Sequence, residues 1–155
     1  MDTNVLVRLV IEDDATQTRA VQQLFATADA IAIGVSCLCE FAWVLRSSYG
    51  YATADIAEAM RTLLRARAIR VDWGAVEAGV NVLEEGGDFA DGVIAFEGAV
   101  LGGRVHMTFD RKAIRALKRI AIEAQRPAMR EINENPGSPS SGAPASGSGL
   151  PGVRR

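Results

Sequence analysis

Short apolar runs alternate with longer segments of helical periodicity along most of this chain. The runs at 30–35, 69–72 and 105–109 have the length of strands, and helical patterns precede and follow each of them. Short apolar strands that are separated by helices predict a parallel sheet covered by helices on both faces. The sequence therefore predicts an α/β fold with a central parallel sheet.

The helices expected around these strands are defined by apolar residues at offsets of three and four. Ser36 and Thr53 are expected to cap two of them, and the pair Gly102-Gly103 is expected to end a small, aliphatic helix that could be buried. The expected helices cover residues 1–11, 16–28, 36–48, a segment from 53, 73–85, 92–101 and a basic segment that ends near 120.

Three aspartates mark the stretch from 86 to 117. Asp88 and Asp91 lie at the start of the small, aliphatic helix, and Asp110 follows the third predicted strand. Helix starts and strand ends point to the same edge of a parallel α/β sheet. We therefore expect an acidic site at that edge.

Length and composition are those of one soluble domain. The 155 residues are enough to bury a core, and 48% hydrophobic and 23% charged residues are ordinary for a globular protein. A net charge of -2 argues against a generally basic nucleic-acid binder, although one basic face could still contact phosphate. Neither a positively charged leader nor an apolar stretch of membrane-spanning length is visible, so we expect a cytoplasmic protein that does not enter the membrane.

The chain is expected to divide into three parts. Residues 1–120 form the folded domain, 121–134 a C-terminal extension, and 135–155 a disordered tail rich in proline, glycine and serine. Cys37 and Cys39 lie in the folded part, two positions apart, and such positions do not face each other on a helix. Free thiols are therefore expected.

Four carboxylates lie where the predicted sheet meets a helix: Asp2, Glu40, Asp91 and Asp110. Glu40 belongs to a helix that is apolar on nearly every side, so it either has a partner or a cation there or points to solvent. Asp2, Asp88 and Asp110 could each be only the N-cap of a helix. Asp91 is harder to explain as a cap, because apolar helical residues follow it directly.

A cluster of these carboxylates has a defined chemistry. Two like charges about 4 Å apart repel by about 4 kcal/mol at an effective dielectric constant of about 20. The cluster therefore either raises its pKa values or binds a divalent cation. Ligands that are all oxygen suit Mg²⁺ or Mn²⁺, which can activate water and hold a phosphate for in-line displacement.

The remaining candidates are weaker. His106 is the single histidine and lies in a predicted strand, where a core or edge position is easier to explain than a metal ligand. The basic residues of 111–119 form either a solvated helix face or a contact with a phosphate backbone. Trp43 and Trp73 are expected to be core or interface anchors.

Four segments taken together resemble the PIN-domain family. They are DTNVLVRL at the start, Glu40 within SCLCEFAWVL, DFADGVIA around Asp91, and TFD ending at Asp110. The resemblance, which is greatest to the VapC-type toxin ribonucleases of type II toxin–antitoxin pairs, implies a PIN-like three-layer α/β/α fold. It also implies an endoribonuclease that depends on Mg²⁺ or Mn²⁺, with Asp2, Glu40 and Asp91 as metal ligands and Asp110 as the fourth.

The same resemblance implies partners and helper residues. Family members typically cleave structured RNA, form homodimers and are inhibited by a cognate VapB-type antitoxin. Thr3, Asn4 and Thr108 would be polar residues near the site.

One departure from the family pattern leaves alternatives open. A strand normally precedes the first aspartate, whereas only Met1 precedes Asp2, so either the true start lies upstream or the first strand is missing. A catalytically impaired module that only binds an antitoxin or RNA is one alternative. A phosphatase of the haloacid-dehalogenase kind is disfavoured, because Asn4 occupies the position at which that family requires a second aspartate.

Overall fold

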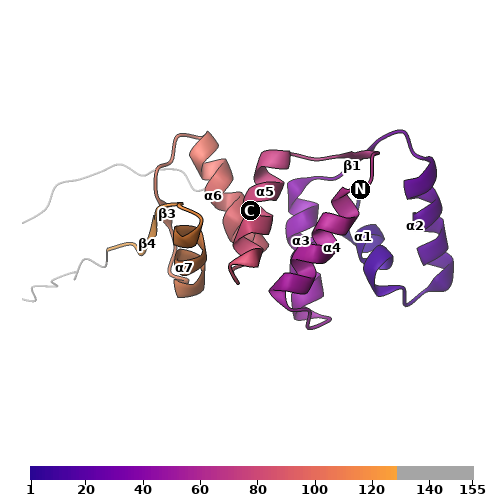
Figure 1. The fold of residues 1–155 in the computed structure, drawn as a ribbon, viewed down its shortest axis with the longest axis horizontal. Coiled ribbons are helices and arrows are strands. Elements are labelled where there is room, and N and C mark those ends of the chain that lie inside the picture. Colours follow the sequence, from indigo (N-terminus) through magenta and orange to yellow (C-terminus); the bar gives the residue numbers. More distant parts are fainter. Residues whose placement is uncertain (129–155) are drawn as a thin grey trace, which may run out of the picture.

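The computed structural model describes residues 1–128, which form helices joined by short connections and very short strands (Figure 1). The predicted tail at 135–155 and the last part of the predicted extension at 121–134 lie outside the described residues. None of the helices of residues 1–128 has the length and hydropathy needed to cross a membrane.

The helices are α1 (Thr3–Ile11), α2 (Ala15–Thr27), α3 (Val35–Ser47), α4 (Thr53–Leu64), α5 (Trp73–Glu84), α6 (Phe89–Val100) and α7 (Arg111–Arg119). The strands are β1 (Ile31–Ala32), β2 (Ile69–Arg70), β3 (His106–Met107) and β4 (Ala124–Gln125).

The strands pair in parallel, as predicted. Ile31 of β1 lies opposite Ile69 of β2, and His106 of β3 lies opposite Ala124 of β4. Within residues 1–128 these pairs are two separate two-stranded sheets, so a single central sheet stays a prediction. The strand β4 was missed, because its two residues contain no apolar run that would distinguish them from a loop.

Aspartate side chains cap most of the helix starts. The predictions for Ser36 and Thr53 are wrong: the caps of α3 and α4 are Gly34 and Ala52, and neither makes a side-chain hydrogen bond. A serine or threonine one or two positions inside the helix cannot accept from the first free N–H groups in the way a cap does. The aspartates that accept a backbone hydrogen bond as N-caps are Asp2, Asp14, Asp72, Asp88 and Asp110.

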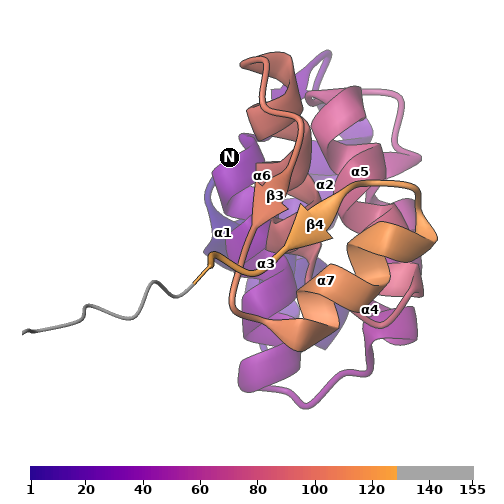
Figure 2. The same cartoon turned by 90° about the vertical axis from the view of Figure 1, so that its left-hand side faces the viewer.

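The helices surround one large core and one small core. In Figure 1, α2 lies at one end of the molecule and α7 lies with β3 and β4 at the other, and Figure 2 shows these last three elements together. The fully buried centre of the large core includes Leu6, Leu38, Phe41, Ile56 and Met60. The small core lies under α7 and consists of Val82, Ala95, Ala116, Leu117 and Ala124.

Helices α5 and α6 approach each other closely because glycines lie between them. A Cβ atom at Gly92 would lie 2.3 Å from the carbonyl oxygen of Ala78, and one at Gly79 would lie 2.5 Å from the ring of Phe89. Helix α6, the small aliphatic helix predicted from the sequence, is only partly buried, since Ile94 is 54% exposed. The close contact fixes α6, and with it Asp91, against α5.

Candidate functional site

Carboxylates and cations share one pocket at the start of α6 and α7. The pocket has a volume of about 450 Å³. We call it the acidic pocket; it is lined by Arg46, Gly86, Gly87, Asp88, Asp91, Asp110, Arg111 and Lys112.

Two of its carboxylates are held by the helices that they cap. The Oδ1 atom of Asp88 accepts a hydrogen bond from the backbone N–H of Ala90 at 3.0 Å, and that of Asp110 accepts one from Lys112 at 2.6 Å. The Nη1 atom of Arg46 lies 3.6 Å from Oδ2 of Asp88. The second oxygen of each aspartate is therefore outside the cap, and the predicted capping roles of Asp88 and Asp110 are confirmed.

Asp91 is the carboxylate whose ionisation the surroundings disfavour most clearly. It lies in the first turn of α6 and is half-buried, and loss of hydration raises its pKa above the ordinary value. The negative charges of Asp88 and Asp110 raise this pKa further, whereas His106 and the backbone N–H of Asp88 act against the shift. An acid of this kind binds a proton or a cation more readily than a fully hydrated carboxylate does.

The other two predicted ligands do not line the acidic pocket: Asp2 lies at the start of α1, and Glu40 lies on α3, where it contacts the residue after Asp2. The hydroxyl of Thr3, which is only 6% exposed, donates a hydrogen bond to Oε2 of Glu40 at 2.7 Å. Asp2 caps α1 by accepting from the backbone N–H of Asn4 at 2.8 Å, and the Met1 amino group donates to the Ala32 carbonyl of β1 at 2.9 Å. Glu40 itself is exposed to solvent and also accepts this hydrogen bond. The prediction of a partner and the alternative of a solvent-exposed side chain are therefore both partly correct.

The four predicted ligands are thus divided into two groups, with Asp91 and Asp110 in one and Asp2 and Glu40 in the other. Within residues 1–128, no three side chains of His, Cys, Asp or Glu are close enough together to hold a metal ion. The donor atoms are carboxylate oxygens, which fit the chemistry of Mg²⁺ or Mn²⁺. The donors therefore suit such an ion, although in residues 1–128 they are not close enough together to bind the same ion.

Helix α3 contacts both α1 and α6. The thiol of Cys37 is 3.4 Å from the Thr3 hydroxyl, on the side of Glu40. Burial raises the pKa of the Cys39 thiol to about 11, with smaller contributions from the charges of Asp88 and Glu97 on the other side. Both cysteines are free, as predicted.

Sequence reasoning missed some residues of the acidic pocket. Arg46 lies near the end of α3 with no motif to distinguish it, and only the packing of α3 against α6 shows that it lines the pocket. Arg111 and Lys112 were considered only as part of a basic run. His106 is half-buried, consistent with the predicted edge position, and is close enough to Asp91 to lower its pKa.

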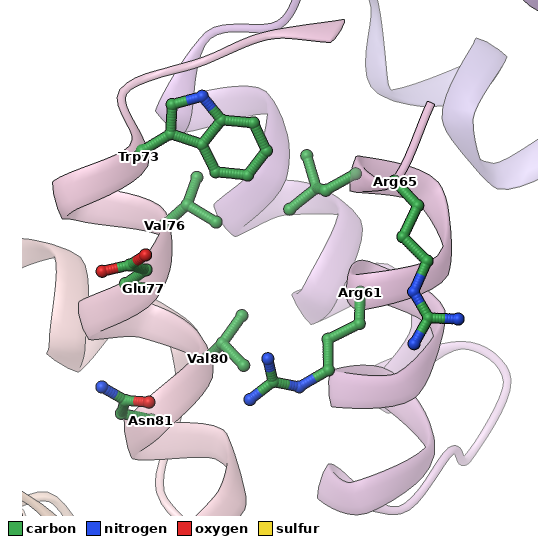
Figure 3. A pocket seen from close by; sticks show the side chains of 8 residues that line it. Arg61, Arg65, Trp73, Val76, Glu77, Val80 and Asn81 are labelled. Atoms are coloured by element: carbon green, nitrogen blue, oxygen red, sulfur yellow. The ribbon is translucent and has the colours of Figure 1, made fainter. Parts of the chain in front are cut away.

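A second pocket, between α4 and α5, has a different character (Figure 3). Its volume is about 240 Å³, and Trp73 lies at one end while Arg61 extends into the gap between the two helices. Glu77 is its only carboxylate, so it is not an acidic site. Trp73 is 49% exposed and Trp43 is 61% exposed, so the core interpretation of both tryptophans is wrong.

Comparison with known families gives a match: the sequence corresponds to the PIN domain over residues 1–121. The chain belongs to the PIN domain family. PIN domains are generally metal-dependent nucleases that act on RNA or DNA and usually use divalent metals such as Mg²⁺ or Mn²⁺. No curated protein and no solved structure matched this PIN domain.

Proposed function

We propose that this PIN domain is a Mg²⁺- or Mn²⁺-dependent endoribonuclease and the toxin of a VapC-type toxin–antitoxin pair. The observation that carries the proposal is the environment of Asp91. This half-buried carboxylate lies beside Asp88 and Asp110 in one pocket, and both raise its pKa. A divalent cation would remove that repulsion, which is why such a group of acids favours binding one.

The proposed ligands are Asp2, Glu40, Asp91 and Asp110. A bound cation would supply an activated water and would neutralise charge on the phosphate. Asp91 and Asp110 contribute carboxylates from α6 and α7, and Glu40 contributes one from α3. The hydrogen bond from Thr3 fixes one oxygen of Glu40 and so limits the positions that its other oxygen can take.

Cations around the acidic pocket support a nucleic-acid substrate. Arg46, Arg111 and Lys112 line the pocket together with the carboxylates. Phosphate contacts of this kind supply most of the affinity of proteins for nucleic acids. The proposed substrate is structured RNA such as transfer or ribosomal RNA, and the same proposal includes a VapB-type antitoxin, a homodimer and a cytoplasmic location.

The test is metal-dependent cleavage of RNA by the purified protein. We expect cleavage with Mg²⁺ or Mn²⁺, no cleavage in EDTA, and a loss of at least about 100-fold in Asp91→Asn, the scale of effect seen when a key electrostatic group is removed. Asp55→Asn is the matched control, because Asp55 is an exposed acid in the first turn of α4. Full activity in Asp91→Asn would refute the assignment of the site.

The division of the acids into two groups favours a second candidate, a PIN domain that binds RNA or an antitoxin without cleaving RNA. This candidate predicts no cleavage with either metal and no rise in melting temperature on addition of Mg²⁺. A rise in melting temperature with Mg²⁺ that is absent in Asp91→Asn would instead support the nuclease.

A further inference from the structure

An exposed aromatic residue directly precedes one of the carboxylates of the acidic pocket in the sequence. Phe109 is 59% exposed although it immediately precedes Asp110, the cap of α7. Consecutive Cα atoms are about 3.8 Å apart, so the backbone of Phe109 adjoins that of Asp110, which lines the pocket. An exposed phenylalanine leaves apolar surface in water, and a ligand that covers the ring would remove that cost.

The ring is faced by a cation. The guanidinium carbon of Arg126 lies 5.7 Å from the centre of the Phe109 ring, within the range of a cation–π interaction. Arg126 follows β4, and β4 pairs with β3, the strand that leads to Phe109. Figure 2 shows these two strands side by side next to α7. The sheet of β3 and β4 therefore holds the two residues together.

The surroundings of the ring are cationic as well. Arg111 and Lys112 follow Asp110 and line the acidic pocket, and both are exposed. Neither they nor Arg126 makes a salt bridge with another residue of 1–128. An aromatic ring among cations is typical of sites that bind single-stranded nucleic acid.

We propose that Phe109, supported by Arg126, is a stacking platform for one unpaired base of the RNA substrate. The base would lie on the ring while Arg111 and Lys112 contact the adjoining phosphates, which places the flanking phosphodiester at the acidic pocket. A base inside a duplex cannot present its face to a side chain, so the platform selects single-stranded segments of RNA. This inference rests on the proposed function and adds the substrate feature that the site recognises.

The test measures binding of a fluorescently labelled, unstructured RNA in EDTA, where metal-dependent cleavage cannot occur. Phe109→Ala should weaken binding about 10-fold, the scale of one stacked base, while Phe109→Trp should bind at least as well as the parent. Trp73→Ala is the matched control, because Trp73 is also a half-exposed aromatic residue but lies in the pocket between α4 and α5. Its binding should equal that of the parent.

A duplex RNA of the same length separates stacking from general attraction to phosphate. Phe109→Ala should bind the duplex as the parent does, whereas Lys112→Ala should weaken binding of both RNAs. Parent-like binding of unstructured RNA by Phe109→Ala would overturn the platform, and so would an equal loss in Trp73→Ala. If Phe109→Ala binds unstructured RNA normally and the parent cleaves RNA, the stacking platform is refuted and the nuclease proposal is retained. If Phe109→Ala loses binding and the parent does not cleave RNA, the nuclease proposal is refuted and the stacking platform is retained.

Discussion

The two groups of acids are built from the same residue types but are stabilised in different ways. On α1 and α3, Glu40 is exposed and accepts a hydrogen bond of 2.7 Å from the buried hydroxyl of Thr3. In the acidic pocket, Asp91 is half-buried beside two further carboxylates, and burial and their charges raise its pKa. A neutral donor satisfies Glu40, whereas Asp91 retains repulsion from Asp88 and Asp110 although three cationic side chains line the same pocket.

The difference indicates that the two groups have different roles. The hydrogen bond from Thr3 positions Glu40 without any ion, so this group is stable as it stands. The close packing of α6 on α5 holds the backbone of Asp91 in place, and its side chain is half-buried there. Strained acids of this kind are frequent at functional sites.

The largest expected effect on stability comes from a substitution in α6, the helix that carries Asp91 of the acidic pocket. Gly92→Ala places a methyl group 2.3 Å from the Ala78 carbonyl, so α6 must move away from α5. Overpacking of this kind costs up to about 3 kcal/mol, and the melting temperature should fall by about 10 °C. Gly98→Ala in the same helix is the control, because its new Cβ meets nothing within 4 Å and should leave stability unchanged or slightly higher. Equal melting temperatures for the two variants would contradict the tight packing of α6.

An intermediate effect is expected in the other group. Thr3→Val keeps the shape of the side chain but removes the hydrogen bond to Glu40, which should cost about 1 kcal/mol and lower the melting temperature by roughly 3 °C. Thr3→Ser retains the hydroxyl and should preserve the geometry of Glu40. Cleavage assays of both variants show whether this geometry matters: if Thr3→Val cleaves RNA as fast as Thr3→Ser, Glu40 is not a ligand that needs positioning.

The smallest effect concerns Asp91 and is a gain in stability. Because the pKa of Asp91 is raised in the folded protein, its protonated form stabilises the folded state. This contribution is fully present at a pH below the ordinary pKa of 3.8, and it is lost as the pH rises through the raised pKa. Asp91→Asn should therefore melt roughly 2 °C above the parent at neutral pH in EDTA, with the gap closing as the pH falls below 3.8. Melting curves with Mg²⁺ complete the measurement, since Mg²⁺ should stabilise only the parent. An equal response of both proteins to Mg²⁺ would contradict the role of Asp91.

Several features of the fold could be predicted because they depend on neighbouring residues. The runs that contain Ile31 and Ile69 predicted two strands that do pair in parallel, although each has only two residues. The capping roles of Asp2, Asp88 and Asp110 follow from the residues just beyond them. Strand β4 could not be predicted. It pairs with β3, which precedes it in the sequence by the length of α7, and this pairing leaves no pattern in the sequence.

The candidate site was only partly predictable for a similar reason. The acids themselves are visible in the sequence, but the exposure of Glu40 and the burial of Asp91 depend on which helices cover them. Arg46 has no distinguishing motif and joins the acidic pocket only because α3 packs against α6. The exposed ring of Phe109 could not be recognised either, since an apolar strand residue is more often buried.

The sequence by itself determined that this chain is a PIN domain with alternating helices and short strands, and which carboxylates begin its helices. These properties are local, since periodicity and capping involve residues within a few positions of one another. The sequence predicted an acidic site that contains Asp88, Asp91 and Asp110, but only the tertiary structure decided that Asp91 is half-buried there and that Glu40 lies with Thr3. The physical reason is that loss of hydration and repulsion between charges depend on distances through space, and only the packing of the helices sets those distances.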